Sequence, residues 1–367
     1  MSSTPPDLAC WAWAHADRLA GLTVPQWELL VRQARSANLL ARLAQRLADQ
    51  GLLGSVPDAP RRHLLEMLTV TAAQHREIRR EIGLILDALR PLGLPVVLLK
   101  GAAYVATGLP AAQGRLFSDI DILVPRAALT EVESHLTLRG WMTTHHTPYD
   151  QRYYRQWMHE LPPMQHLRRQ TVLDVHHNIL PLTVRQVPDA QRLLASARPV
   201  PGLPGAAVLA PADMLLHSMA HLLHNDDLSH GLRDLTDLDL LLRHFSAEPG
   251  FWPTLFDRAA HLHLQRTLHY GLWATHHLLA TPVPAAALAQ ARRSAPPAAL
   301  DALMRALWRR TLRTPHRTAA LRFDASARLA LYVRAHWLRM PPLMLARHLA
   351  IKAWMRASAR SEAAAPA

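Results

Sequence analysis

The feature that most constrains the fold is a change of hydrophobic period in the middle of the chain. Residues 25–50 and 60–90 repeat apolar side chains every three or four positions, which is typical of amphipathic helices. Between 91 and 200 the pattern changes to short apolar or alternating runs, which predict strands at residues 95–99, 119–124, 141–146, 163–168 and 171–177. From Pro211 onward helical spacing returns, and helices are expected over 211–225, 231–246, 252–280, 285–312 and 325–357.

This order of elements predicts an α/β (α+β) fold in which a small mixed β-sheet is flanked by helical regions. We expect an N-terminal helical region at 1–90, a core at 91–200 and a C-terminal helical, basic region at 201–367. A chain of 367 residues suits two domains, or one large domain with extensions, and can bury a sizeable core.

Composition excludes several classes of protein. Apolar residues make up 50% of the chain and charged residues 19%, which excludes a disordered chain. The single cysteine, Cys10, excludes a disulfide framework and a cysteine-based zinc site. The N-terminus lacks a secretory pattern, and no uncharged apolar stretch reaches the roughly 18 residues that a membrane span needs. The expected location is therefore the cytoplasm.

The positive charge is concentrated in the last third of the chain. The net charge is +13; residues 251–367 hold 17 basic and 4 acidic residues, whereas residues 1–250 hold 24 of each. Trp308, Trp337 and Trp354 are interspersed with these basic side chains, which are Arg309, Arg310, Arg313, Arg317, Arg322, Arg328, Arg334, Arg339, Arg347, Lys352, Arg356 and Arg360.

This pattern leaves three interpretations open. Arginine can bind the phosphates of RNA while tryptophan stacks on its bases, or the region can bind an anionic membrane surface or another acidic partner. Alternatively, the arginines cover solvated helix faces and the tryptophans pack inside.

Two carboxylates alternate along the predicted strand at 119–124. Since strand side chains alternate between faces, Asp119 and Asp121 are expected on the same face. Two carboxylates this close repel each other, and a divalent cation between them relieves the repulsion. Mg²⁺ prefers oxygen ligands of this kind, together with substrate phosphates.

A third carboxylate, Asp174, lies between apolar neighbours in the predicted strand at 171–177. If the two strands are adjacent, the three carboxylates form a two-metal site. One ion would activate the attacking oxygen, and the other would bind the triphosphate and the leaving group.

The turn after the strand at 95–99 supplies a candidate phosphate site. Gly101 lets the backbone approach a ligand closely, and a helix starting there would present free N–H groups. Lys100, one of only two lysines, or Arg115 would neutralise phosphate charge. For Arg115 a structural ion pair is an equal alternative.

Taken together, Leu-Lys-Gly at 99–101, Arg-x-x-x-Asp-Ile-Asp-Ile-Leu-Val at 115–124 and Leu-Asp-Val-His at 173–176 resemble a known family. It is the uncharacterised bacterial nucleotidyltransferase family of the DNA polymerase beta-like superfamily, and the resemblance covers roughly residues 60–245. It implies that Asp119 and Asp121 bind the metal ions, that Asp174 completes the site and deprotonates the acceptor, and that Gly101 lines the triphosphate.

The sequence departs from the superfamily pattern in two places. Ala102 stands where a serine or glycine is usual, and the interval from Gly101 to Asp119 is longer than in minimal members. Lys100 is expected to replace the missing hydroxyl. The predicted nucleotide-binding residues are therefore Lys100, Gly101, Ala102, Arg115 and Ser118, although Ser118 also suits a simple turn.

Several histidines are expected near the site. His217, His221 and His224 are spaced by four and three residues and share one helix face, which would suit zinc or simple packing. Because histidines are scattered throughout the chain, simple packing is preferred over zinc, and support of the metal ligands is the alternative role. The residues expected to give such support are His176, His221, His224 and Asp237.

The predicted function is Mg²⁺-dependent transfer of a nucleoside monophosphate from an NTP to a hydroxyl or phosphate of an acceptor. By analogy with relatives, a small molecule or peptide is the favoured acceptor. Nucleotidylation of a protein or tRNA, of antitoxin type, is the alternative within enzymes. Outside enzymes, Ala102 leaves open a non-catalytic nucleotide-binding or scaffold protein.

Overall fold

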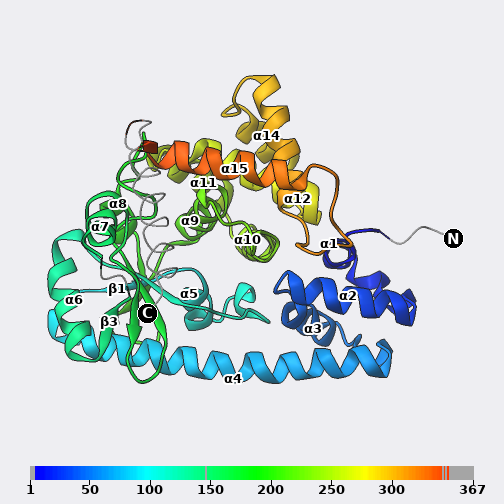
Figure 1. Cartoon of the computed structure of the whole chain (residues 1–367), viewed down its shortest axis with the longest axis horizontal. Coiled ribbons are helices and arrows are strands. Elements are labelled where there is room, and N and C mark those ends of the chain that lie inside the picture. Colours follow the sequence, from blue (N-terminus) through cyan, green and yellow to red (C-terminus); the bar gives the residue numbers. More distant parts are fainter. Residues whose placement is uncertain (1–4, 145–146, 341–342, 344, 347–367) are drawn as a thin grey trace, which may run out of the picture.

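The protein contains a seven-stranded sheet surrounded by helices (Figure 1). A computed structural model describes residues 5–144, 147–340, 343, 345 and 346. The strand order is β3-β4-β5-β2-β1-β7-β6. The strands are β1 (Val96–Leu98), β2 (Ile120–Leu123), β3 (Trp141–Thr143), β4 (Met164–His166), β5 (Val172–His176), β6 (Arg198–Pro199) and β7 (Ala206–Val208).

The sheet is mixed, as predicted. Strand β2 runs parallel to β5, and β1 runs parallel to β7, while β1 and β2 are antiparallel. The central strands β1 and β2 are buried along their whole length; β1 is entirely apolar, and β2 is apolar apart from Asp121. The predicted fold class is therefore confirmed.

In the first half of the chain, helices both precede and follow β1 in the sequence. They are α1 (Leu8–Ala14), α2 (Val24–Ser36), α3 (Leu40–Asp49), α4 (Asp58–Leu89), α5 (Lys100–Thr107) and α6 (Leu129–Leu138), with short 3-10 turns at η1 (Ala16–Gly21), η2 (Leu53–Ser55), η3 (Arg90–Leu92), η4 (Pro110–Ala112) and η5 (Arg126–Ala128). The long helix α4 runs along the lower edge in Figure 1 and contacts α2, α3, α5 and α6. It therefore connects the N-terminal helices to the sheet.

The second half of the chain is mostly helical. Its elements are α7 (Pro148–Arg152), the π-helix η6 (Tyr153–Trp157), α8 (Ala190–Ala195), α9 (Pro211–His224), α10 (Gly231–Phe245), α11 (Phe251–His261), α12 (Gln265–Leu279), α13 (Ala285–Arg292), α14 (Ala298–Thr311) and α15 (Asp324–Arg339). Helices α9, α10 and α12 contact one another, and Figure 1 places α9 and α10 above the sheet and α5.

Three expected helices are interrupted in the structure. The segment at 25–50 forms α2 and α3, with Asn38 at φ 55° between them, and the segment at 252–280 breaks into α11 and α12 near His263 at φ 57°. The segment at 285–312 is divided before α14 at Pro296 and Pro297, because proline disfavours a helical residue before it.

Other expected bounds also change. The expected strands are shorter than predicted, and the sheet gains β6 and β7, which the sequence did not predict. Residues 145 and 146 of one expected strand lie outside the described residues. Helix α15 ends at Arg339, and most of the expected helix beyond it lies outside the described residues as well.

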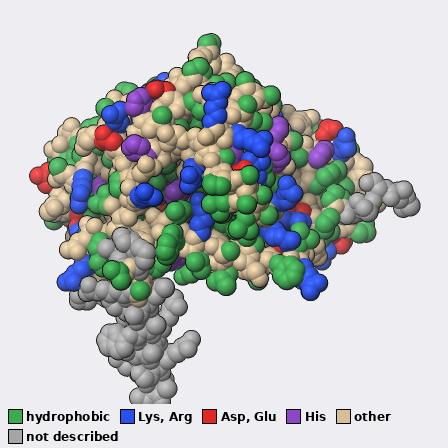
Figure 2. Space-filling view, turned by 90° about the horizontal axis from the view of Figure 1, so that it is seen from above, with side chains coloured by type: hydrophobic (Ala, Val, Ile, Leu, Met, Phe, Trp, Pro, Cys, Tyr) green, Lys and Arg blue, Asp and Glu red, His purple; other side chains and the backbone are tan. Residues whose placement is uncertain are grey.

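The basic C-terminal helices contain many paired arginines. Arg310, Arg313 and Arg339 lie near Asp324, Asp7 and Asp226, respectively. Trp308 is buried, whereas Trp337 is 61% exposed. Figure 2 shows Lys and Arg side chains at separate places on this face, with hydrophobic side chains between them. Arg347, Lys352, Trp354, Arg356 and Arg360 lie outside the described residues.

Within the described part of the chain, no helix combines the length and the apolar character needed to cross a bilayer.

Candidate functional site

The pairing of two parallel strands brings the three carboxylates together. In the register of β2 and β5, Asp121 lies opposite Asp174, and Asp119 immediately precedes β2. One carboxylate oxygen from each of the three residues lies within 4.8 Å of the others. Alternation along the strand placed Asp119 and Asp121 on one face, the family resemblance implied that Asp174 completes the site, and the pairing of β2 with β5 brings the three together.

Asp121 is the most strongly paired of the three. Its Oδ1 atom accepts hydrogen bonds from Lys100 Nζ at 2.8 Å and from His176 Nε2 at 2.9 Å. Burial alone would raise the pKa of Asp121, but Lys100 and His176 hold it well below its usual value. Asp121 is therefore ionised at neutral pH although its side chain is only 6% exposed.

The pKa values of Asp119 and Asp174 are raised, in contrast to that of Asp121. Burial, followed by the charges of Asp121 and Glu160, raises the pKa of Asp174 to about 8. Burial and Asp121 also raise the pKa of Asp119, to which Ser118 Oγ donates a hydrogen bond at 3.0 Å. Asp174 is therefore largely protonated at neutral pH when no cation is bound, because a further negative charge beside Asp121 and Glu160 is unfavourable.

These residues fit a divalent cation. The buried Asp174 Oδ1 atom has no hydrogen-bond partner among the described residues, and all three side chains offer the oxygen ligands that Mg²⁺ prefers. An ion here would satisfy that oxygen and would lower the repulsion among the three carboxylates.

The turn between β1 and α5 forms one wall of the site. Lys100 adopts φ 43°, in the left-handed region that is unfavourable for a residue with a side chain. Gly101 follows, and a Cβ atom at this position would lie 2.1 Å from the ring of Phe117. A side chain at position 101 would therefore force the Phe117 ring to shift. Ala102 is buried in α5.

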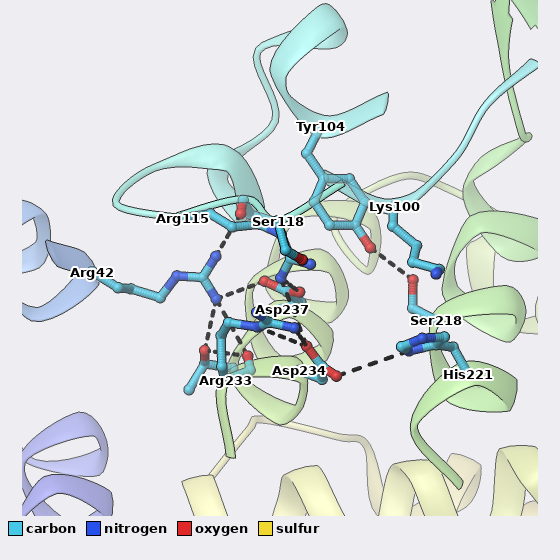
Figure 3. Close-up of polar contacts among 12 residues, drawn as sticks. Arg42, Lys100, Tyr104, Arg115, Ser118, Ser218, His221, Arg233, Asp234 and Asp237 are labelled. Carbon is cyan, nitrogen blue, oxygen red and sulfur yellow. Dashed lines mark hydrogen bonds and ion pairs between the residues drawn. The ribbon is translucent and has the colours of Figure 1, made fainter. Parts of the chain in front are cut away.

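The opposite wall comes from α9 and α10 (Figure 3). His221 Nδ1 of α9 lies 3.9 Å from Asp234 Oδ2 of α10, and Arg233 Nη2 contacts Asp234 Oδ1 at 2.8 Å. Burial and then Lys100 lower the pKa of His221 to about 3, so that its imidazole is neutral. These walls enclose a cavity of about 150 Å³, which Lys100, Gly101, Ser118, Asp119 and Asp121 also line.

Arg115 lines the same cavity but is held by α10 through a buried network. Its guanidinium contacts Asp237 and lies 3.8 Å from Asp234. Asp237 also accepts a hydrogen bond from Arg42 Nη1 of α3 at 2.6 Å. Figure 3 shows both arginines converging on Asp237, which therefore anchors three parts of the chain.

The expected histidine face is divided between different surroundings. His221 reaches the carboxylate cavity, whereas His224 Nε2 contacts Thr267 Oγ1 at 3.0 Å and lines a separate cavity. His217 is buried, and its Nδ1 atom has no hydrogen-bond partner among the described residues. Among the described residues, two groups of side chains are suited to a metal ion, and neither includes His217, His221 or His224.

Sequence reasoning missed residues that lie beside the site. His159 and Glu160 approach His176, and Asp234 joins Arg115 to His221. The spacing of His159 and Glu160 carries no motif, because they follow an irregular segment. Asp234 lies in the same helical segment as the expected supporting residue Asp237, but no pattern in that segment singles it out.

Comparison with protein families gives one match. Residues 23–280 match the family described as uncharacterised nucleotidyltransferase, which is more than half of the chain. The matched range includes all three carboxylates and ends directly after α12. Neither the curated proteins nor the solved structures give a significant match.

Proposed function

The chain belongs to the uncharacterised nucleotidyltransferase family, and from this premise we propose that it transfers a nucleoside monophosphate from an NTP to an acceptor in the presence of Mg²⁺. Pyrophosphate is the leaving group, and the acceptor supplies a hydroxyl or phosphate oxygen. The observation that carries the proposal is the convergence of Asp119, Asp121 and Asp174 within 4.8 Å.

Asp119, Asp121 and Asp174 would hold the metal ions. Bound Mg²⁺ supplies charge neutralisation at the phosphates and makes the attacking oxygen more acidic. Lys100 lies on the same side of the cavity and can donate to a phosphate oxygen once Asp121 has another partner. Asp174 would bind the ion through Oδ1, which lacks a hydrogen-bond partner among the described residues, and would use its other carboxylate oxygen to accept the proton that leaves the acceptor once the ion has lowered its pKa.

The remaining residues position the substrate. The N-terminal turn of α5 directs backbone N–H groups of the Gly101 segment toward the phosphates. Arg115 is held by Asp237 and Asp234, and so presents a fixed positive charge at the cavity wall. Most of the rate enhancement would come from such positioning and electrostatics, as is usual in phosphoryl transfer.

A neighbouring cavity suits the acceptor. It has a volume of about 560 Å³, shares Asp227 and Ser229 with the carboxylate cavity, and is also lined by Arg317 and Arg328. Cavities of about 300–1,000 Å³ typically hold small molecules. This size supports a small molecule or a short peptide as acceptor, and the lining offers both arginines and the carboxylates of Asp226, Asp227 and Asp324 for polar contacts with it.

The first test identifies the product and the required carboxylate. Purified protein is incubated with Mg²⁺ and each labelled NTP in a cell lysate, and the molecule that acquires label is identified. Asp121→Asn should lower labelling about a hundredfold or more, because several kcal/mol of transition-state stabilisation is lost. The matched control is Asp87→Asn, an exposed aspartate of α4 that should retain full labelling.

The result separates the enzyme from a binding protein. If Asp121→Asn labels its acceptor at the wild-type rate, the proposed site is wrong. If no molecule is labelled but NTP with Mg²⁺ raises the unfolding temperature of wild type, and not of Asp119→Ala, the protein binds nucleotides without transferring them.

A further inference from the structure

We propose that His159, Glu160 and His176 form a second metal site, for Zn²⁺, next to the carboxylate site. One ligand atom from each of these side chains lies within 4.8 Å of the other two. The inference concerns a different ion and different ligand chemistry, and it does not depend on the proposed nucleotide transfer.

The backbone holds the three residues together. Glu160 forms an antiparallel bridge with His176 at the end of β5, and the carbonyl oxygen of His159 accepts the N–H group of His177 at 2.8 Å. The rings of His159 and His176 lie 5.2 Å apart between centroids. The side chains are thus fixed by a short β-like pairing, as a preformed metal site requires.

The ring nitrogens of His176 have different partners. Nε2 lies 2.9 Å from the Asp121 carboxylate, to which it donates, while Nδ1 lies 3.2 Å from Glu160 Oε2 without forming a hydrogen bond. Burial alone would lower the pKa of His176, but Asp121 and Glu160 raise it, which favours a proton on Nδ1 facing Glu160, and a zinc ion would take the place of that proton. Two atoms bound to one tetrahedral zinc ion at about 2.0–2.1 Å lie about 3.3 Å apart, close to this separation.

His159 supplies a second free nitrogen. Its Nδ1 atom is buried and has no hydrogen-bond partner among the described residues. A buried polar atom without a partner is unfavourable, and where one occurs in a folded protein it often binds an ion or has a catalytic role. A metal ion between His159, Glu160 and His176 would bind one nitrogen of each ring and the Glu160 carboxylate together.

The ligand types select the metal. Two imidazole nitrogens and one carboxylate are a known zinc set, whereas Mg²⁺ prefers oxygen ligands only. The ligating histidine of a zinc site commonly donates its other N–H group to a carboxylate, as His176 does to Asp121. The Glu160 side chain is 17% exposed, so that one of the three ligands contacts solvent.

The experiment measures metal binding by the full chain. The protein is stripped with a chelator, titrated with Zn²⁺ in excess Mg²⁺, and analysed for bound metal; Co²⁺ serves as a spectroscopic probe of nitrogen ligands. The variants are His159→Ala and Glu160→Gln. The matched control is His177→Ala, which removes the adjacent buried histidine of the same segment. Asp119→Asn with Asp174→Asn disables the carboxylate site.

We expect stripped wild type to bind one Zn²⁺ per chain in the titration. With Co²⁺ in place of Zn²⁺, it should give the strong visible absorption of a four-coordinate ion. His159→Ala and Glu160→Gln should each weaken Zn²⁺ binding at least about tenfold, while His177→Ala should not. The variant that lacks Asp119 and Asp174 should still bind Zn²⁺, so this result is independent of nucleotide transfer.

The proposal is overturned if stripped wild type binds no Zn²⁺, because His176 would then simply bridge Asp121 and Glu160 as an imidazolium. It is also overturned if binding disappears with Asp119 and Asp174 but survives His159→Ala. Metal-free thermal unfolding shows whether each variant is folded. Glu160→Gln, which keeps the side-chain shape, decides the matter if His159→Ala does not fold.

Discussion

At the scale of single residues, the carboxylates of the site differ in their hydrogen-bond partners. Asp121 is paired with Lys100 and His176, whereas Asp174 has a buried oxygen without a partner among the described residues. Such an arrangement sacrifices stability for function, because the residue that is ready to bind a cation is costly without one.

This imbalance predicts that Asp174→Asn stabilises the metal-free protein. The unfolded carboxyl has the ordinary pKa of 3.8, and the folded one has a pKa of about 8. Between these values the folded state binds the extra proton, so wild-type stability falls as pH rises. The unfolding temperature of Asp174→Asn should therefore exceed that of wild type by a margin that grows from pH 4 to pH 8.

Thermal unfolding in chelator across this pH range checks the prediction. Asp189→Asn, which alters an exposed carboxylate at the start of α8, is the control for the change of side chain. Saturating Mg²⁺ should reduce the margin, because the ion stabilises only the protein with an intact site. A margin that is equal at pH 5 and pH 8 would contradict the raised pKa.

At the scale of elements, the turn from β1 to α5 depends on a close approach between segments. The ring of Phe117 lies where a side chain at position 101 would begin, and it also contacts His75 of α4 edge-on. The hydrogen bonds of Phe117 N and O with Gln74 fix its backbone to the same helix. The turn between β1 and α5 is thus supported by α4 through Phe117.

Gly101→Ala should therefore lower the free energy of unfolding by about 1–3 kcal/mol, because overpacking forces its neighbours to move. Gly83→Ala is the matched control: no atom lies within 4 Å of the position that its new methyl group would occupy, and alanine should stabilise α4 by about 0.5–1 kcal/mol. Urea unfolding measures both changes.

The double variant Gly101→Ala with Phe117→Ala tests the cause. If the ring is what the new methyl group meets, the two losses will be clearly less than additive. Full additivity would show that another contact, or the backbone itself, is responsible.

At the scale of the whole molecule, one buried ion network joins separate parts of the chain. Arg42 of α3 donates to Thr236 Oγ1 at 2.7 Å, to Asp237 at 2.6 Å and to the carbonyl of Ala111 at 2.6 Å. Its side chain is 2% exposed. The N-terminal helices are therefore bound both to η4 and to α10, which carries one wall of the site.

Arg42→Met should lower the free energy of unfolding by about 3–5 kcal/mol, since removing one partner leaves buried polar groups unpaired. Arg61→Met, which breaks the exposed pair with Asp58, should cost no more than about 1 kcal/mol. Chemical denaturation compares the two variants. Similar losses would mean that Arg42 is not a buried anchor.

The Arg42–Asp237 contact joins the first and third of the three expected regions, 1–90, 91–200 and 201–367. This division of the chain stays a prediction. Helix α4, in the first expected region, contacts α6 in the second as well as α2 in its own. Strand β7 belongs to the sheet but lies beyond position 200, in the third expected region. Limited proteolysis, which cuts where few contacts cross a boundary, is the measurement that decides it.

What the sequence alone determined is local. An apolar run identified β1, alternation identified β2 and placed Asp119 and Asp121 on one face, and a short strand pattern identified β5. Helical spacing identified α4, α9 and α10. It did not locate the breaks at Asn38 and His263, where backbone conformation and packing override helical periodicity.

The tertiary structure decided which local features meet. The pairing of β2 with β5 brought Asp174 to Asp121, and a β-like bridge brought Glu160 to His176. The convergence of Arg42 and Arg115 on Asp237 likewise joins positions far apart in the chain. Periodicity records only which face a side chain occupies; which faces come together depends on burying the whole core at once, and one short segment does not encode that.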